Sequence, residues 1–295
     1  MDDVPTVSDL KRWLLHDVEY LRRRSDLHWN TAIVETIREL KSAALPAVYF
    51  GGTLRSLLLA RLSGKRKIGR PRDLDIVVAD NSIESLRGRL QQHILRETRF
   101  GGLKLLREAW QFDVWPLHQT WAFKEDQSLP ASFDALPATT FFNLEAIAVD
   151  AWTKRGAPRQ VYSGDDRFFD GLLTQTIELN RESNPYPALC VVRSLVMACS
   201  TRFFIGSRLC EYLVTARDLV SDKELDDIQL HHYGARRMHV EDMRRQLNYI
   251  AKSHAERPGK KVKLMLGEQL PLWEDGQLGP RMNFHILNGR RIRQQ

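Results

Sequence analysis

Asp73 and Asp75 stand one residue apart at the start of the apolar run Ile76-Val77-Val78. Because side chains alternate across a β-strand, carboxylates at positions i and i+2 project from the same face. Two such carboxylates repel each other and form a natural seat for a hard, oxygen-seeking cation such as Mg²⁺. The pattern predicts that both aspartates bind a divalent metal ion. The alternative interpretation is a solvated strand end.

Asp113 is a candidate for a third carboxylate, within the segment Trp110–Trp115 (WQFDVW). An aspartate between aromatic residues in a central strand is costly unless it is paired or ligates a cation. A strand next to the one with Asp73 would place Asp113 beside the pair. Two-metal catalysis uses a third carboxylate to hold the metal of the nucleophile and to take a proton from a hydroxyl. The alternative is an edge-strand aspartate that faces water.

Gly51 and Gly52 lie between a predicted strand at 47–50 and a predicted helix at 53–62. A glycine turn that enters a helix offers backbone N–H groups and the positive helix end to a phosphate. Arg55, one turn into this helix, could reach a triphosphate. A plain tight turn and a surface arginine are the alternatives. A metal seat beside a phosphate-binding turn indicates phosphoryl or nucleotidyl transfer.

The loop before Asp73 is strongly basic, and its five cations are Lys65, Arg66, Lys67, Arg70 and Arg72. Most charge runs are only solvated loops. This one enters the strand with the acids directly, so its cations could contact a triphosphate or a nucleic acid.

The elements expected around these residues form a mixed α/β domain followed by a helical domain. Apolar residues at helical spacing predict two helices, at 9–24 and 29–42, before the glycine turn. Strand patterns follow near 74–78, 95–98, 103–108 and 111–117, with a helix at 83–92. Later helices are expected at 189–200, 207–219, 221–231 and 240–251. The predicted domains are 1–166, 167–254 and a basic tail, 255–295.

The composition is that of an ordinary soluble globular protein, with 43% hydrophobic and 27% charged residues. A net charge of +7 favours a polyanionic partner. Cys190, Cys199 and Cys210 lie in apolar helical sequence and are predicted to be buried free thiols of a reducing compartment. No stretch approaches the about 18 apolar residues of a membrane span, and the start of the chain is not a signal peptide. We therefore expect a cytoplasmic protein with no membrane contact.

Two motifs carry a resemblance to a known family. Gly51–Leu59 (GGTLRSLLL) and Asp73–Ile76 (DLDI) resemble the opening motifs of class II nucleotidyltransferases of the polymerase-β superfamily. These are the bacterial-type poly(A) polymerases and the CCA-adding tRNA nucleotidyltransferases. Weaker similarity continues through Thr140–Ala146, which resembles the family's Asp-Phe-Thr-hydrophobic-Asn-Ala segment. Ser183–Pro187, with Arg193 beyond it, resembles the family's Glu-Asp-Pro-x-Arg helix.

The resemblance implies a polymerase-β-like head with a mixed sheet, followed by a helical domain. It implies an enzyme that moves a nucleoside monophosphate from a nucleoside triphosphate to an acceptor hydroxyl, with RNA of a tRNA-like kind as the acceptor and Mg²⁺ or Mn²⁺ as cofactor. The implied catalytic and metal-binding residues are Asp73, Asp75 and Asp113. The implied nucleotide contacts are Gly51, Gly52, Arg55, Asn143 and Arg193.

The chain departs from the family where the incoming base is read. The family's Asp and Arg that read the Watson–Crick edge of CTP or ATP are replaced by Asn184 and Pro187. Proline has no side-chain donor, so base selection by that route is lost. The run Glu241–Arg245 matches the same pattern by letter but lies too far along the chain, and we interpret it as a helix surface. Transfer chemistry without CCA synthesis is the resulting prediction.

Two alternatives remain open for the function. The acceptor could be a small molecule, a protein or another nucleotide. The chain could also be a non-catalytic nucleotide-binding or RNA-binding relative in a toxin–antitoxin or defence system.

Overall fold

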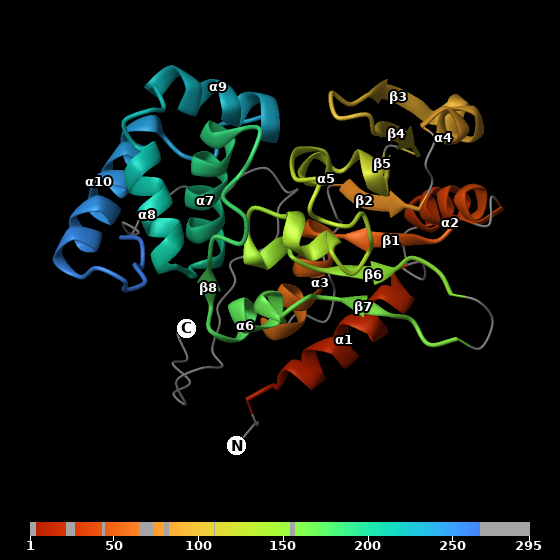
Figure 1. Cartoon of the computed structure of the whole chain (residues 1–295), viewed down its shortest axis with the longest axis horizontal. Coiled ribbons are helices and arrows are strands. Elements are labelled where there is room, and N and C mark those ends of the chain that lie inside the picture. Colours follow the sequence, from red (N-terminus) through yellow and green to blue (C-terminus); the bar gives the residue numbers. More distant parts are fainter. Residues whose placement is uncertain are drawn as a thin grey trace. The chain divides into compact units, whose positions relative to one another are not determined.

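The computed structural model of the chain describes residues 4–21, 27–42, 45–64, 73–79, 83–108, 110–153 and 157–265 (Figure 1). These residues form two compact units. Unit 1 contains the described residues up to 140 and those of 144–169, and unit 2 contains Phe141–Asn143 and 170–265. The domain limits expected at 166 and 254 stay a prediction. Most of the expected basic tail lies outside the described residues.

Unit 1 is built on a mixed sheet. Its described strands follow the order β3-β4-β5-β2-β1-β6-β7, in which β2 and β5 are parallel and the other neighbours antiparallel. Figure 1 shows β1, β2 and β5 at the centre of this sheet. The strands are β1 (Ala47–Phe50), β2 (Asp73–Val78), β3 (Ile94–Glu97), β4 (Leu103–Arg107), β5 (Trp110–Pro116), β6 (Ala148–Asp150) and β7 (Val161–Tyr162).

Unit 1 also contains helices. They are α1 (Val7–Tyr20), α2 (Leu27–Ser42), α3 (Gly52–Leu62), α4 (Ile83–Leu90) and the short α5 (Trp121–Glu125). Single 3₁₀ turns occur at Gln91–His93, Leu117–Gln119, Leu136–Thr139 and Asn143–Glu145. Helix α1 begins with a capping box, in which Thr6 and Asp9 each accept a hydrogen bond from the backbone of the other. Along the chain, α6 (Arg167–Leu173) leads from unit 1 to unit 2.

The two faces of the sheet have different chemistry, and β5 shows this most clearly. Its residues alternate between buried and partly exposed, with Phe112 and Val114 fully buried. The indole of Trp29 from α2 packs on this buried face, with ring centroids 4.4 Å from Trp110 and 6.3 Å from Phe112. The partly exposed face therefore carries Asp113, as alternation requires.

Unit 2 is mainly helical. Its helices are α7 (Pro187–Thr201), α8 (Ser207–Ala216), α9 (Asp222–Tyr233) and α10 (Val240–Glu256). A two-stranded parallel sheet joins β8 (Thr176–Ile177) to β9 (Phe204–Ile205). The predicted fold class, a mixed sheet followed by a helical region, is confirmed. The short elements α5, α6, β8 and β9 were not predicted.

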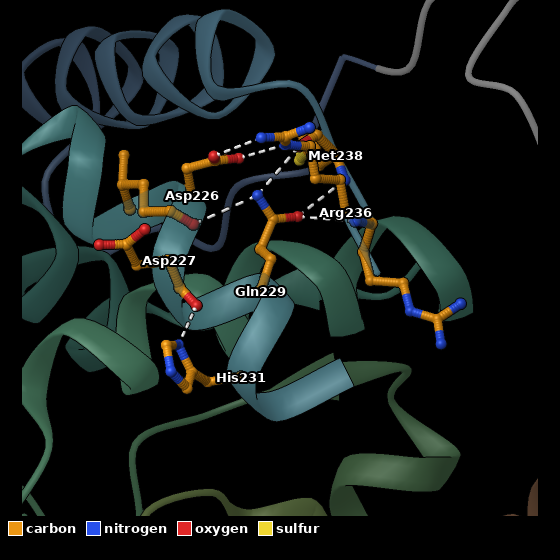
Figure 2. Close-up of polar contacts among 8 residues, drawn as sticks. Asp226, Asp227, Gln229, His231, Arg236 and Met238 are labelled. Carbon is orange, nitrogen blue, oxygen red and sulfur yellow. Dashed lines mark hydrogen bonds and ion pairs between the residues drawn. The ribbon is translucent and has the colours of Figure 1, made fainter. Parts of the chain in front are cut away.

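Gln229 holds the connection between α9 and α10 (Figure 2). Its fully buried amide nitrogen donates to the carbonyls of Leu225 and Met238, at 3.2 and 3.1 Å. Its amide oxygen accepts from the backbone N–H groups of Arg237 and Met238, at 2.8 and 2.9 Å. The amide nitrogen and the amide oxygen of Gln229 thus make two hydrogen bonds each, which is the full capacity of a side-chain amide. This explains how a connection with little apolar sequence keeps one conformation.

The three cysteines are free thiols, as predicted. Cys190 and Cys210 are buried, whereas Cys199 is only half-buried, so the prediction of a buried thiol was wrong for Cys199. Burial, with a smaller contribution from Asp242, raises the pKa of Cys199 to about 12. Burial also raises the pKa of Cys210 to about 12. No helix among the described residues is long and apolar enough to cross a membrane.

Candidate functional site

The two aspartates of β2 lie on the partly exposed face of the sheet of unit 1. Asp73 and Asp75 are half-buried, while Leu74 between them is fully buried, which is the alternation expected of this strand. In the parallel pairing of β2 with β5, Asp75 stands opposite Asp113 and Asp73 opposite Gln111. The structure therefore brings the three predicted carboxylates to neighbouring positions on one face of the sheet.

The N-terminus of α3 is attached to the strand that carries these aspartates. Phe50, the last residue of β1, pairs with Asp75, so the glycine turn begins directly beside the acids. The hydroxyl of Thr53 donates a hydrogen bond of 2.8 Å to the backbone carbonyl of Asp73. On the other side, the N–H of Gly51 donates to the carbonyl of Ile147 at 3.0 Å. These bonds hold the start of the helix in register with the two carboxylates.

The two glycines differ in backbone conformation, so only one of them is required by the fold to be glycine. Gly51 adopts φ +65° and ψ −119°, a conformation that L side chains rarely enter. Gly52 has no positive φ, and among the described residues a Cβ there would meet only the guanidinium of Arg55, at 3.8 Å. The packing of the chain itself thus leaves room for a side chain at 52. A bare backbone at this helix N-terminus is what the close approach of a phosphate requires.

Arg55 is held beside this turn by an acid that the sequence interpretation missed. Its guanidinium donates to the carboxylate of Glu145 at 2.8 Å, and the side chains are 19% and 12% exposed. The backbone carbonyl of Glu145 lies 3.8 Å from the position of a Cβ on Gly51. Glu145 therefore places Arg55 against the glycine turn. Its place in the Thr140–Ala146 motif was the signal that could have identified it.

Lys104 is a second residue that was not predicted. It is the cross-strand partner of Asp113 in the antiparallel pairing of β4 with β5. Its ammonium group donates to the Asp113 carboxylate at 3.1 Å and to the side-chain oxygen of Gln111 at 3.5 Å. The side chains of Lys104 and Asp113 are 17% and 23% exposed. The face with the acids thus includes one lysine.

The donors on this face suit a hard divalent cation, because carboxylate oxygens are the ligands that Mg²⁺ prefers. In the described ranges, however, no three His, Cys, Asp or Glu side chains come together closely enough to hold a metal ion. Asp113 has an ammonium group at its carboxylate. Asp73 and Asp75, the same-face pair of β2, are therefore the residues that fit the metal best.

Asn143 and Arg193 belong to unit 2. The amide of Asn143 donates to the carbonyl of Thr176 at 3.0 Å and accepts from the N–H of Glu178 at 2.8 Å. It is 4% exposed, so these bonds tie the segment Phe141–Asn143 into unit 2. The guanidinium of Arg193 lies 5.3 Å from the centre of the Phe142 ring. Nucleotide contacts by Asn143 and Arg193 stay a prediction.

The residues at the lost base-reading positions shape the start of α7. The side chain of Asn184 accepts a hydrogen bond of 2.8 Å from the N–H of Tyr186, and Pro187 is the first residue of the helix. In the later run, Arg244 of α10 donates to Asp222 at 2.5 Å and to the carbonyl of Arg217 at 2.7 Å. Arg244 thus anchors α10 within unit 2. The five cations of the basic loop lie outside the described residues.

Comparison with known proteins gives a structural match but no sequence match. No family model and no curated protein matches the chain. A CCA-adding enzyme in complex with CTP is similar with a TM-score of 0.55 at 14% identity, over 82% of this chain and 54% of that one. The Thermotoga maritima CCA-adding enzyme complexed with tRNA gives a TM-score of 0.52 at 15% identity, over 72% and 50%.

A tRNA-processing enzyme in an apo form gives a TM-score of 0.50 at 16% identity, over 79% of this chain and 57% of that one. The chain spans about half the length of these proteins. At such identities the similarity shows the fold. It confirms that the fold of the chain resembles that of CCA-adding enzymes.

Proposed function

We propose that the chain is a metal-dependent nucleotidyltransferase that transfers a nucleoside monophosphate from a nucleoside triphosphate to an acceptor hydroxyl. One observation carries this proposal. The hydrogen bond from Thr53 to the carbonyl of Asp73 fixes the glycine turn at the start of α3 against the strand with the two aspartates. A phosphate-binding turn and a divalent-metal seat in fixed register are the parts that such transfer needs.

The residues of the site divide the work as follows. The phosphates bind at the bare backbone of Gly52, beside the guanidinium of Arg55. Asp73 and Asp75 hold Mg²⁺ or Mn²⁺, which supplies positive charge to the triphosphate when it is bound. Asp113, opposite Asp75, accepts the proton of the acceptor hydroxyl.

In the transfer itself, the acceptor oxygen forms a bond to the α-phosphorus as the bond from that phosphorus to the bridging oxygen breaks. Pyrophosphate leaves with the electron pair of that bond. Positioning of the two reactants and neutralisation of the triphosphate charge provide most of the acceleration.

RNA is the acceptor that we favour. The net charge of +7 suits a polyanion. Among the structurally similar enzymes, one is complexed with tRNA, and others are complexed with CTP and with ATP. Asn184 and Pro187 lack the side chains that would read CTP or ATP in the resembled family, so we do not extend the proposal to synthesis of a CCA end.

A labelled-nucleotide assay tests the proposal. Each of the four α-³²P-labelled triphosphates is supplied with Mg²⁺ or Mn²⁺, first with total cellular RNA and then with pools of small-molecule and protein acceptors. Label in RNA that depends on Asp73 and Asp75 supports the proposal. Label in another acceptor redirects it to that acceptor class. Absence of metal-dependent triphosphate binding contradicts it and favours a non-catalytic relative.

A further inference from the structure

The ion pair of Lys104 with Asp113 changes the number of metal ions that the proposed site can hold. We infer that the ammonium group of Lys104 takes the place of a second divalent ion at Asp113, so that the chain binds a single divalent ion, through Asp73 and Asp75. This inference rests on the proposed function of the same site. It makes Lys104 a residue that positions Asp113.

The register of the sheet, and not only the rotamer of a flexible side chain, places Lys104 beside Asp113. Lys104 and Asp113 are directly opposite in the antiparallel β4–β5 pair, where side chains on one face are close neighbours. Leu103 and Leu105, on either side of Lys104, are buried, so β4 cannot turn the lysine away without exposing its core residues. The lysine is therefore built into the face that bears the acids.

Two oxygen acceptors hold the ammonium group where it is. The carboxylate of Asp113 lies at 3.1 Å and the amide oxygen of Gln111 at 3.5 Å. Both members of the ion pair are mostly buried, at 17% and 23% exposure, so water and salt screen their attraction only partly. A divalent ion ligated by Asp113 would have to displace the ammonium group or bear its repulsion at close range.

Binding of Mn²⁺ to the full chain, followed by the electron paramagnetic resonance signal of free Mn²⁺, tests this inference without an activity measurement. Wild type should bind one Mn²⁺ per chain. Asp75→Asn should weaken binding by about tenfold or more, because it removes a ligand and a charge. The double variant Lys104→Met/Asp113→Asn removes a neutral pair and should bind within about threefold of wild type.

The charge-swap variant Lys104→Asp/Asp113→Lys provides a second test, because it exchanges the two residues and keeps both charges on this face of the sheet. It too should bind Mn²⁺ like wild type. Thermal unfolding checks that each variant is folded. If either folded double variant weakens Mn²⁺ binding as strongly as Asp75→Asn, Asp113 is a metal ligand and the inference is wrong.

Mn²⁺ binding distinguishes failure of this inference from failure of the proposed function. Two Mn²⁺ ions per wild-type chain, both lost on substitution of the acids, would overturn the inference and leave the proposed function intact. Wild-type affinity in Asp75→Asn, or no Mn²⁺ binding by wild type, would contradict the metal seat and with it the proposed function.

Discussion

Substitution of Gly52 by alanine separates the role of this residue in the fold from its role in binding phosphate. The new Cβ would lie 3.8 Å from the nearest atom of the described residues, the guanidinium nitrogen of Arg55, which is ordinary van der Waals contact. Gly52 is the first residue of α3. Alanine there should stabilise the chain by about 0.5 kcal/mol, because it lowers the entropy of the unfolded state. Gly52→Ala should therefore unfold at the wild-type temperature or slightly above it.

Triphosphate binding should respond in the opposite direction. The added methyl group stands where a phosphate would approach the backbone at the helix N-terminus. Loss of one charge-assisted hydrogen bond costs about 1.5–3 kcal/mol, which corresponds to roughly 10- to 100-fold weaker binding. Isothermal titration of the Mg²⁺ complex of a non-hydrolysable triphosphate analogue gives the affinity.

Gly51→Ala is the matched control, because Gly51 has a positive φ and Gly52 does not. At φ +65° an alanine should cost about 1–3 kcal/mol of stability. Gly51→Ala should lower the unfolding temperature, whereas Gly52→Ala should not. Wild-type triphosphate affinity in a folded Gly52→Ala protein would refute the reasoning that places phosphate at this turn.

Three further predictions concern the framework of the two units. Thr53→Val removes the 2.8 Å hydrogen bond to the carbonyl of Asp73 and should lower the free energy of unfolding in urea by about 1 kcal/mol. It should also raise the KM for the triphosphate, and an unchanged KM would show that this hydrogen bond does not position the site. Gln229→Leu removes the side-chain hydrogen bonds to four backbone groups and leaves those of Arg237 and Met238 without this partner. It should destabilise unit 2 by about 3 kcal/mol, and a loss below about 1 kcal/mol in urea unfolding would contradict this. Because burial raises the pKa of Cys199 and Cys210 to about 12, iodoacetamide at pH 8 should label them about 10³-fold more slowly in the folded chain than in urea, with a rate that rises with pH. Equal labelling rates in the folded chain and in urea would contradict the raised pKa values of these two thiols.

The sequence predicted best those features that depend on local pattern. The strand Ala47–Phe50 has the bounds that its apolar residues and the following glycines indicated. The same-face arrangement of Asp73 and Asp75 follows from alternation alone, which every regular strand obeys. The later helices were likewise predicted from periodicity, whereas the mixed sheet was expected from the resemblance to class II nucleotidyltransferases.

Features that depend on pairing between distant residues were not predicted. Arg55 and Glu145 are 90 positions apart, and although each lies in a motif, neither motif indicates that the two side chains pair. Lys104 faces Asp113 only because the β4–β5 register places it there, and a slip of one residue would send it to the other face. The amide of Gln229 binds a segment nine positions away, a contact that apolar periodicity does not report.

Asn143 shows how a motif can indicate one role while the structure displays another. Its motif suggested contact with a nucleotide. The structure uses both polar atoms of the side chain to hold the backbone of Thr176 and Glu178. The residue type at one position of a weak motif does not distinguish a contact with a ligand from hydrogen bonds to the backbone, because both roles need the same amide group.

The most direct test of the central claim is the rate of label transfer from an α-³²P triphosphate by Asp75→Asn, measured under single-turnover conditions with the acceptor that the screen identifies. Asp134→Asn, the same change at an exposed carboxylate of unit 1, is the control. The account predicts a loss of about 10³-fold or more in Asp75→Asn, and a wild-type rate in Asp134→Asn. Wild-type turnover by a folded Asp75→Asn protein would contradict it.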